Sequence, residues 1–219
     1  MKKTPLFLWL LAVLFMWGCR QPPKSTVGKE LFWDFESAKV ETLPPGWLAA
    51  ESAGKTPSAA WQIVEDSWGK SIALTRSTNT GKTCNLLLAT HSSVANLKLS
   101  AKIRAVGGKE SQSSGVIWRA LSGDNYYLAC WDPLENVLRL AFVEAGRLTL
   151  LQSVYVQAEP ANWHTLEIEH FRDNIKVSMD GVLRIEQRDD TLRYPGMVGL
   201  WTQADACAMF DDIRVREIR

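Results

Sequence analysis

Apolar and polar residues alternate along most of the chain beyond residue 30. In residues 97–104 the sequence LKLSAKIR places apolar side chains on one face of an extended segment and polar side chains on the other. A period of two predicts strands with one buried and one wet face. Short turns such as Ala145-Gly146 and Asp180-Gly181 separate such runs, and no segment has a convincing long helical period. The pattern therefore predicts an all-β protein built as an antiparallel two-sheet sandwich.

The turns divide the chain into many short strands. We expect strands at residues 30–36, 61–64, 71–75, 83–90, 97–104, 115–120, 125–131, 136–144 and 147–155, followed by the alternating runs after Trp163. Residues 43–47 and 106–114 are expected loops. Residues 30–219 are ample for one core and form one predicted domain.

The amino terminus has the pattern of an export signal. Four residues, two of them lysines, precede an almost wholly apolar run from Pro5 to Trp17, which is shorter than the ~20 residues of a spanning helix. Gly18-Cys19 resembles a bacterial lipobox. We expect a lipoprotein signal at residues 1–18, lipidation of Cys19 and a tether at 19–29, with plain secretion or an uncleaved anchor as alternatives. The predicted location is the bacterial envelope, in the outer membrane or periplasm, or outside the cell.

The charge balance limits the class of binding partner, and the cysteine count limits the number of disulfides. The chain has 25 basic and 24 acidic residues, and removal of the signal leaves 23 basic residues against the same 24 acids. No basic block is present, which argues against nucleic acid and favours a neutral polymer such as a glycan. Cys84, Cys130 and Cys207 form no C-x-x-C pair, so at most one disulfide within the chain is possible. Eight of the ten tryptophans lie in the predicted mature part, more than a core of this size needs, and we expect two or three in a groove that stacks on sugar rings.

Several motifs occur in the order found in concanavalin A-like jelly rolls. They are G-V-I-W-R-A from Gly115, D-N-Y-Y from Asp124, and the later runs M-D-G, P-G-M-V-G-L-W-T-Q-A-D and F-D-D-I-R-V. Over residues 31–218 the chain resembles bacterial exported domains grouped with laminarinase-type glycoside hydrolases and 3-keto-disaccharide hydrolases. The laminarinase triplet E-x-D-x-x-E is missing from the sequence; the nearest pair, Glu167 and Glu169, is more typical of the wet face of a strand.

The alternation also predicts a ligand-binding face. If Leu138 and Leu140 are core, Arg139 lies opposite; if Tyr126 and Cys130 are core, their neighbours lie opposite too. The predicted binding set is Arg119, Tyr127, Trp131, Arg139 and Trp201, with Asp205 placed to orient an arginine or a sugar hydroxyl. Aromatic faces with guanidinium groups suit a saccharide. The alternative is that these side chains cover a sheet face under a loop and stack on one another.

A second set of oxygens lies on the terminal strands. Asp34 and Glu36 are on the first strand, and Asp211 and Asp212 are on the last. In β-jelly-roll sugar-binding domains such strands pair and hold a structural calcium, here through Glu36 and Asp211. The alternative is two wet edge strands with ordinary acids.

Three functions fit these observations. The first is a surface-tethered glycan-binding protein, favoured by the aromatic surplus and the absent carboxylate triplet. The second is a glycoside hydrolase acting on a 3-keto-disaccharide or a β-glucan, implied by the resemblance, whose catalytic residues do not map onto this sequence. The third is a structural envelope protein without a sugar ligand.

Overall fold

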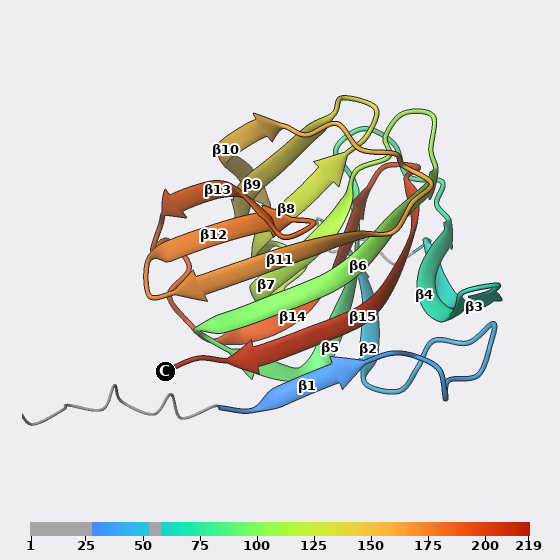
Figure 1. The fold of residues 1–219 in the computed structure, drawn as a ribbon, viewed down its shortest axis with the longest axis horizontal. Helices are drawn as coiled ribbons and strands as arrows, with labels where there is room; N and C mark the ends of the chain where they lie inside the picture. Colours follow the sequence, from blue (N-terminus) through green and yellow to red (C-terminus); the bar gives the residue numbers. More distant parts are fainter. Residues whose placement is uncertain (1–27, 53–57) are drawn as a thin grey trace, which may run out of the picture.

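Two antiparallel sheets lie face to face in the computed structural model, which describes residues 28–52 and 58–219 (Figure 1). Sheet A has eight strands. Its order is β13 (Val182–Arg188), β12 (Asn174–Met179), β11 (His164–Phe171), β6 (Leu97–Gly107), β15 (Cys207–Glu217), β4 (Gly69–Arg76) and β3 (Ala60–Asp66), with β1 (Glu30–Trp33) paired to β15.

Sheet B has seven strands. Its order is β10 (Arg147–Tyr155), β9 (Val137–Glu144), β8 (Asn125–Asp132), β7 (Ser114–Ser122), β14 (Gly196–Gln203), β5 (Cys84–Val94) and β2 (Trp47–Glu51). The predicted all-β sandwich is confirmed. The strand β2 was not expected, because its sequence WLAAE lacks alternation.

The main core fills the space between the sheets. In β6 every second residue from Leu97 to Ala105 is buried, as the alternation predicts. Sheet A contributes aliphatic residues such as Ile103 and Ile168, and sheet B contributes large rings, including Trp118 and Trp131. Burial of this apolar surface is the main stabilising contribution to the fold.

Tight turns join neighbouring strands. Asp180 and Gly181 have φ of 53° and 73°, and Ala145 and Gly146 have φ of 49° and 76°. Two successive positive φ values are characteristic of the type I′ hairpin turn, whose twist matches that of the paired strands. Both turns lie where the dipeptides predicted them.

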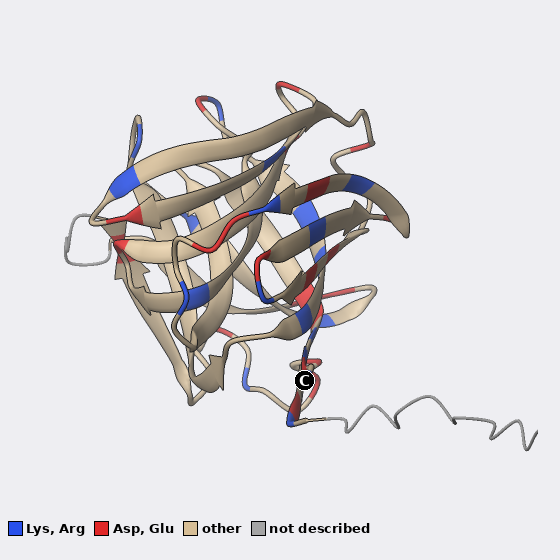
Figure 2. Ribbon diagram, turned by 90° about the vertical axis from the view of Figure 1, so that its left-hand side faces the viewer, with Lys and Arg blue, Asp and Glu red and all other residues tan. Residues whose placement is uncertain are grey.

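Some expectations concern other parts of the chain. The predicted signal, the tether up to residue 27 and Cys19 lie outside the described residues. Across the part of the chain that is described, no helix has the length and apolar character needed to cross a membrane. The thiols of Cys84, Cys130 and Cys207 are all free. Basic and acidic positions are interspersed along the strands (Figure 2).

Candidate functional site

A groove of about 780 Å³ lies on the outer face of sheet B, the face turned away from sheet A. Its floor belongs to a second apolar cluster, separate from the core between the sheets. The cluster includes Tyr126, Leu128 and Cys130 on β8, Val143 on β9 and Trp201 on β14. Because successive side chains of a strand point to opposite faces, these residues alternate with those that fill the main core.

Strand register divides the groove into an apolar and a polar half. Leu148 of β10 lies beside Val143, which pairs with Tyr126 of β8. One step along, Leu150 lies beside Ala141, which pairs with Leu128. Farther along β8, toward the turn that leads into β9, Cys130 pairs with Arg139. Asp132 is the last residue of β8. The outward side chains of these strands therefore change from aliphatic to charged along the strand axis, and Arg147 lines the groove next to Leu148 at the aliphatic end.

Hydrogen bonds fix the polar wall. Ser113 Oγ donates to Asp132 Oδ2 at 2.6 Å, and the backbone N–H of Leu134 donates to Asp132 Oδ1 at 2.9 Å. Arg139 donates to the carboxylate of Glu135. Glu110 lies in loop 108–113, which joins β6 to β7, and its Oε1 accepts the N–H of Gly81 at 2.7 Å. Each of these three carboxylates is already engaged.

The floor beneath is neutral. Trp201 Nε1 donates to the hydroxyl of Tyr126 at 3.3 Å, and both side chains are almost fully buried. Burial raises the pKa of Cys84 to about 11 and the pKa of Cys130 to about 12. Burial likewise raises the pKa of Tyr126. These groups are protonated at neutral pH, so none of them acts as a base or a thiolate nucleophile there.

The structure divides the predicted binding set. Arg139 and Trp201 line the groove, as expected. The placement of Tyr127 and Trp131 on that face is wrong, because both are fully buried between the sheets and Tyr126 and Cys130 take the outer face instead. Trp131 Nε1 donates to the carbonyl of Val156 at 3.0 Å. The alternation of β8 was assigned one residue out of phase.

Arg119 also lies away from the groove. Its φ of 48° interrupts the alternation of β7, and its guanidinium donates to the carbonyl groups of Ala95, Leu192 and Arg172 at 2.7–3.1 Å. Tyr127 accepts the N–H of Leu192 at 3.2 Å and donates to Asp189. The expectation that Arg119 shares a face with the groove residues is therefore wrong. Arg119 and Tyr127 together hold the segment between β13 and β14.

Asp205 has a different role from the one expected. Its carboxylate accepts the backbone N–H groups of Lys109, Glu110 and Ser111 at 2.7–3.2 Å. Burial works to raise the pKa of Asp205, but these three donors outweigh it and hold the pKa below its ordinary value. Asp205 orients neither an arginine nor an open position in the groove. It holds loop 108–113, which carries Glu110 and Ser111 to the groove rim.

The two buried histidines, His164 and His170, form hydrogen bonds with other side chains of the protein. His170 accepts a hydrogen bond from Trp118 Nε1 at 2.9 Å on Nδ1, and burial lowers its pKa to about 3. His164 Nδ1 lies 2.8 Å from Asp180 Oδ2. The two histidines sit on the core face of β11, whereas Glu167 and Glu169 point outward.

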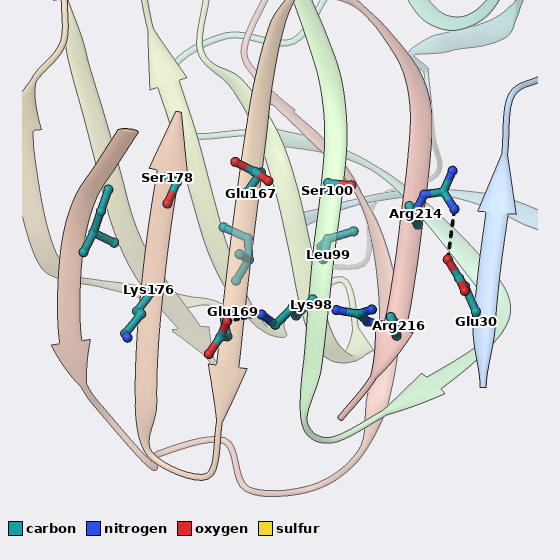
Figure 3. Close-up of a pocket in the computed structure, with 12 residues that line it drawn as sticks. Glu30, Lys98, Leu99, Ser100, Glu167, Glu169, Lys176, Ser178, Arg214 and Arg216 are labelled. Atoms are coloured by element: carbon teal, nitrogen blue, oxygen red, sulfur yellow. Dashed lines mark hydrogen bonds and ion pairs between the residues drawn. The ribbon is translucent and has the colours of Figure 1, made fainter. Parts of the chain in front are cut away.

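A second hollow, of about 480 Å³, lies on the outer face of sheet A (Figure 3). Its side chains form cross-strand ion pairs, with Lys98 Nζ 2.6 Å from Glu169 Oε2 and Arg214 Nη1 2.9 Å from Glu30 Oε1. Small side chains at Ser100 and Ser178 leave the space beside Glu167. The lining of this hollow is mostly charged, whereas the groove on sheet B also has an apolar cluster as its floor, so the groove on sheet B is the better candidate for a saccharide.

The calcium prediction concerns the first and last strands, β1 and β15, which pair as expected. Asp211 and Asp212 lie in the middle of β15, but Asp34 and Glu36 follow β1 and are not on it, so that part of the expectation is wrong. Asp212 Oδ2 lies 2.6 Å from Lys102 Nζ, and Asp34 Oδ1 accepts the N–H of Glu36 at 3.3 Å. Asp211 Oδ1 is buried with no hydrogen-bond partner, and burial, with Asp212 and Glu36 nearby, raises its pKa to about 6. Among the described residues no three His, Cys, Asp or Glu side chains gather around one point. Glu36 and Asp211 fit a cation as two ligands only, and calcium stays a prediction.

Sequence reasoning missed most of the polar rim and the aliphatic wall. The missed residues are Lys82, Glu110, Ser111, Ser113, Asp132, Glu135, Arg147, Leu148, Leu150 and Gln203. Many of them are in loops or on the edge strand β10, where alternation is a weak guide. The spacing of Glu135 and Arg139 across the turn into β9 was the one local signal available.

Comparison with known proteins supports this architecture. The family model described as 3-keto-alpha-glucoside-1,2-lyase-like domain matches residues 41–216. A search of curated protein sequences gives no match. Among solved structures, the chain is similar to the carbohydrate-binding module CBM66 from Bacillus subtilis, with 20% identity, a TM-score of 0.63, and coverage of 77% of this chain and 94% of that chain.

Two further solved structures have the same fold. The β-glucanase of Bacillus licheniformis is 15% identical with a TM-score of 0.59, covering 88% of this chain and 99% of that chain. Domain 4 of an extracellular arabinanase from Geobacillus stearothermophilus, solved with arabinotriose, is 11% identical with a TM-score of 0.54, covering 85% and 91%. At these identities the likeness establishes the jelly-roll fold that carbohydrate-binding modules and glycoside hydrolases share.

Proposed function

This chain belongs to the 3-keto-alpha-glucoside-1,2-lyase-like domain family, and from that membership we propose that its groove on sheet B binds a saccharide. One observation carries the proposal: an apolar floor and a fixed rim of hydrogen-bonding side chains share one sheet face. Ligand pockets typically combine such an apolar lining with a few placed polar groups. The solved neighbours include a carbohydrate-binding module and a domain with bound arabinotriose.

Binding without cleavage fits the groove better than hydrolysis. Glycoside hydrolases generally need an acid and a base or nucleophile, two carboxyl groups about 5 to 10 Å apart. In this groove Glu110, Asp132 and Glu135 each accept a hydrogen bond or an ion pair from the protein itself. The outward side chains of β8 at the centre of the floor are Tyr126, Leu128 and Cys130, and the one carboxylate on this face of the strand, Asp132, lies at its end.

The second candidate is cleavage of a 3-keto-glycoside, and the family match is the observation that favours it. A ketone at C3 makes the proton at C2 acidic, so one base can start elimination of the group at C1. Asp132 is the buried carboxylate nearest the floor, but Ser113 and Leu134 occupy its two oxygens. Each oxygen keeps a further lone pair, so Asp132 could accept a proton while both donors stay in place.

One purified sample tests both candidates. It is titrated by calorimetry with a panel of plain disaccharides and glucans, and incubated with plain and 3-keto glycosides while products are followed by chromatography. Binding without product formation supports the proposed binding function. Turnover of the 3-keto glycoside assigns the second candidate, and absence of both binding and turnover rejects both.

Attachment to the cell envelope is the remaining part of the proposal. The sequence of residues 1–19 supports it, through the apolar run and the Gly18-Cys19 pair. A lipid on Cys19 and the stretch at 19–29 would hold the domain at a membrane surface while leaving the groove open to glycans.

A further inference from the structure

The groove presents aliphatic rather than aromatic side chains to solvent. Leu148 and Leu150 on β10 are each 51% exposed, whereas Tyr126 is 0% and Trp201 is 1% exposed. A saccharide that stacks on aromatic rings needs open ring faces, and these two rings are almost wholly buried. The apolar surface available to a ligand is therefore mainly that of the two leucines.

Exposed leucines on an edge strand are unfavourable unless something covers them. Apolar side chains and free backbone groups on a sheet edge promote association with other chains. β10 is the last strand of sheet B, and its residues Arg147 to Leu150 are all exposed. The two leucines are continuous with the buried Val143 and Ala141, so they extend the floor of the groove out to its rim.

The opposite half of the groove is built for hydroxyl groups. Arg139 is held by Glu135 through one nitrogen and keeps further N–H donors. Ser111 and the Ser113–Asp132 pair add a fixed polar wall. A ligand that satisfies both halves has a polar end that forms hydrogen bonds and an apolar end that lies on leucines.

Basic and acidic side chains are equally frequent in the lining of the groove. Lys82, Arg139 and Arg147 are basic, and Glu110, Asp132 and Glu135 are acidic. Equal numbers of each sign favour a neutral ligand over a fatty acid or a phosphorylated lipid.

From these observations we propose that the groove accepts a neutral glycoside with an apolar aglycone, its sugar toward Arg139 and its aglycone on Leu148 and Leu150. The proposal rests on the proposed function, because it assigns the sugar to the groove already described. It adds a class of ligand: alkyl or aryl glycosides in preference to the unsubstituted saccharide.

The test compares ligands that differ only in the aglycone. Methyl and hexyl glucosides, the corresponding galactosides and 1-hexanol are titrated by calorimetry into the full chain, below the concentrations at which the alkyl glycosides aggregate. We expect the hexyl glycoside of the preferred sugar to bind at least tenfold more tightly than its methyl counterpart. The double variant Leu148→Ser/Leu150→Ser should lose that gain and bind both alike.

A matched control is available on the other sheet. Leu183 of β13 is also 51% exposed and lies on the outer face of sheet A, so Leu183→Ser should leave both affinities unchanged. Because all three leucines are half exposed, these variants are expected to fold, which an unchanged melting temperature verifies.

The outcomes separate this proposal from the function on which it rests. Equal binding of methyl and hexyl glycosides by the wild-type protein overturns the aglycone assignment and leaves saccharide binding intact. Binding of 1-hexanol as tight as that of the hexyl glycoside also overturns it, since the sugar then contributes nothing. If no plain or substituted saccharide binds, the proposed function fails and this inference fails with it.

Discussion

The hydroxyl of Tyr127 contributes to stability rather than to ligand binding. The hydroxyl donates to Asp189 and accepts the N–H of Leu192 at 3.2 Å. The Tyr127 side chain is buried between the sheets. Tyr127→Phe removes the hydroxyl that Asp189 and the N–H of Leu192 bond to, which lowers the free energy of unfolding by about 1–3 kcal/mol. Urea denaturation should show this loss, with saccharide affinity unchanged. Tyr155→Phe is the control, because Tyr155 is exposed and its hydroxyl donates to Gln157, two residues along the chain; equal effects in the two variants would contradict the assignment.

His170 makes the protein sensitive to acid. Burial lowers its pKa to about 3, whereas an unfolded chain protonates histidine near 6.5. Between these values the unfolded state binds a proton that the folded state does not, so stability falls as the pH falls, by about 1.4 kcal/mol per pH unit.

The variant His170→Gln isolates that contribution. Glutamine can still accept the hydrogen bond from Trp118 but does not titrate. We expect His170→Gln to be less stable than wild type at pH 7, and this difference to shrink as the pH falls from about 6.5 to about 4. Denaturant midpoints at each pH measure it. His91→Gln, at an exposed site, should follow wild type; parallel curves for His170→Gln and wild type would exclude the effect.

Single residues also explain why the binding face could not be assigned from sequence. Seven successive residues of β8, from Tyr126 to Asp132, are buried, with Tyr126, Leu128 and Cys130 on one face and Tyr127, Ala129 and Trp131 on the other. When both faces are apolar, alternation gives the period but not which face is inside. In β9 the polar Arg139 marks the outer face, and there the assignment is correct.

At the scale of elements, Asp205 connects the end of β14 to the groove rim. Three successive N–H groups of loop 108–113 donate to its carboxylate, and hydrogen bonds to a charged acceptor are worth about 1.5–3 kcal/mol. Asp205→Asn replaces one oxygen by a donor that faces these donors. We expect amide hydrogen exchange at Lys109, Glu110 and Ser111 to accelerate at least tenfold, with weaker saccharide binding. Asp190→Asn, where the carboxylate is exposed and pairs with Arg193, should change neither.

The pairing of β1 with β15 is the element to which the calcium prediction belongs. A cation held by Glu36 and Asp211 would join the segment after β1 to the last strand, so chelation by EDTA should lower the melting temperature. Asp211→Asn should abolish the effect of EDTA, whereas Asp212→Asn, which loses the contact with Lys102, should retain it. An unchanged melting temperature in EDTA removes the calcium site.

Elements were predictable to different degrees. The hairpin turns at Asp180-Gly181 and Ala145-Gly146 were readable because positive φ restricts which residues fit. The bulge at Arg119 was not, because arginine carries no signal for positive φ and only the surrounding carbonyl groups hold it there.

For the whole molecule, the fold follows from local patterns and the site does not. Alternation and turns define strands one at a time, and antiparallel neighbours then form two sheets. The groove depends on which face of sheet B is outside and on loops far apart in sequence, since Asp205 and Gly81 both hold loop 108–113. Family motifs identified the jelly roll, but the residues that line this groove come from register and loop contacts.

The prediction that concerns the whole molecule is its location at the cell envelope. If residues 1–18 are a signal and Cys19 is acylated, the wild-type protein should label with radioactive palmitate and sediment with membranes. Cys19→Ser should abolish labelling and move the domain to the soluble exported fraction, with saccharide affinity unchanged because the groove lies in residues 52–203. Cys207→Ser, at another free and partly exposed thiol, should keep the label. Unlabelled wild-type protein in the soluble fraction would contradict the anchor and support plain secretion, which still brings the groove to extracellular glycans.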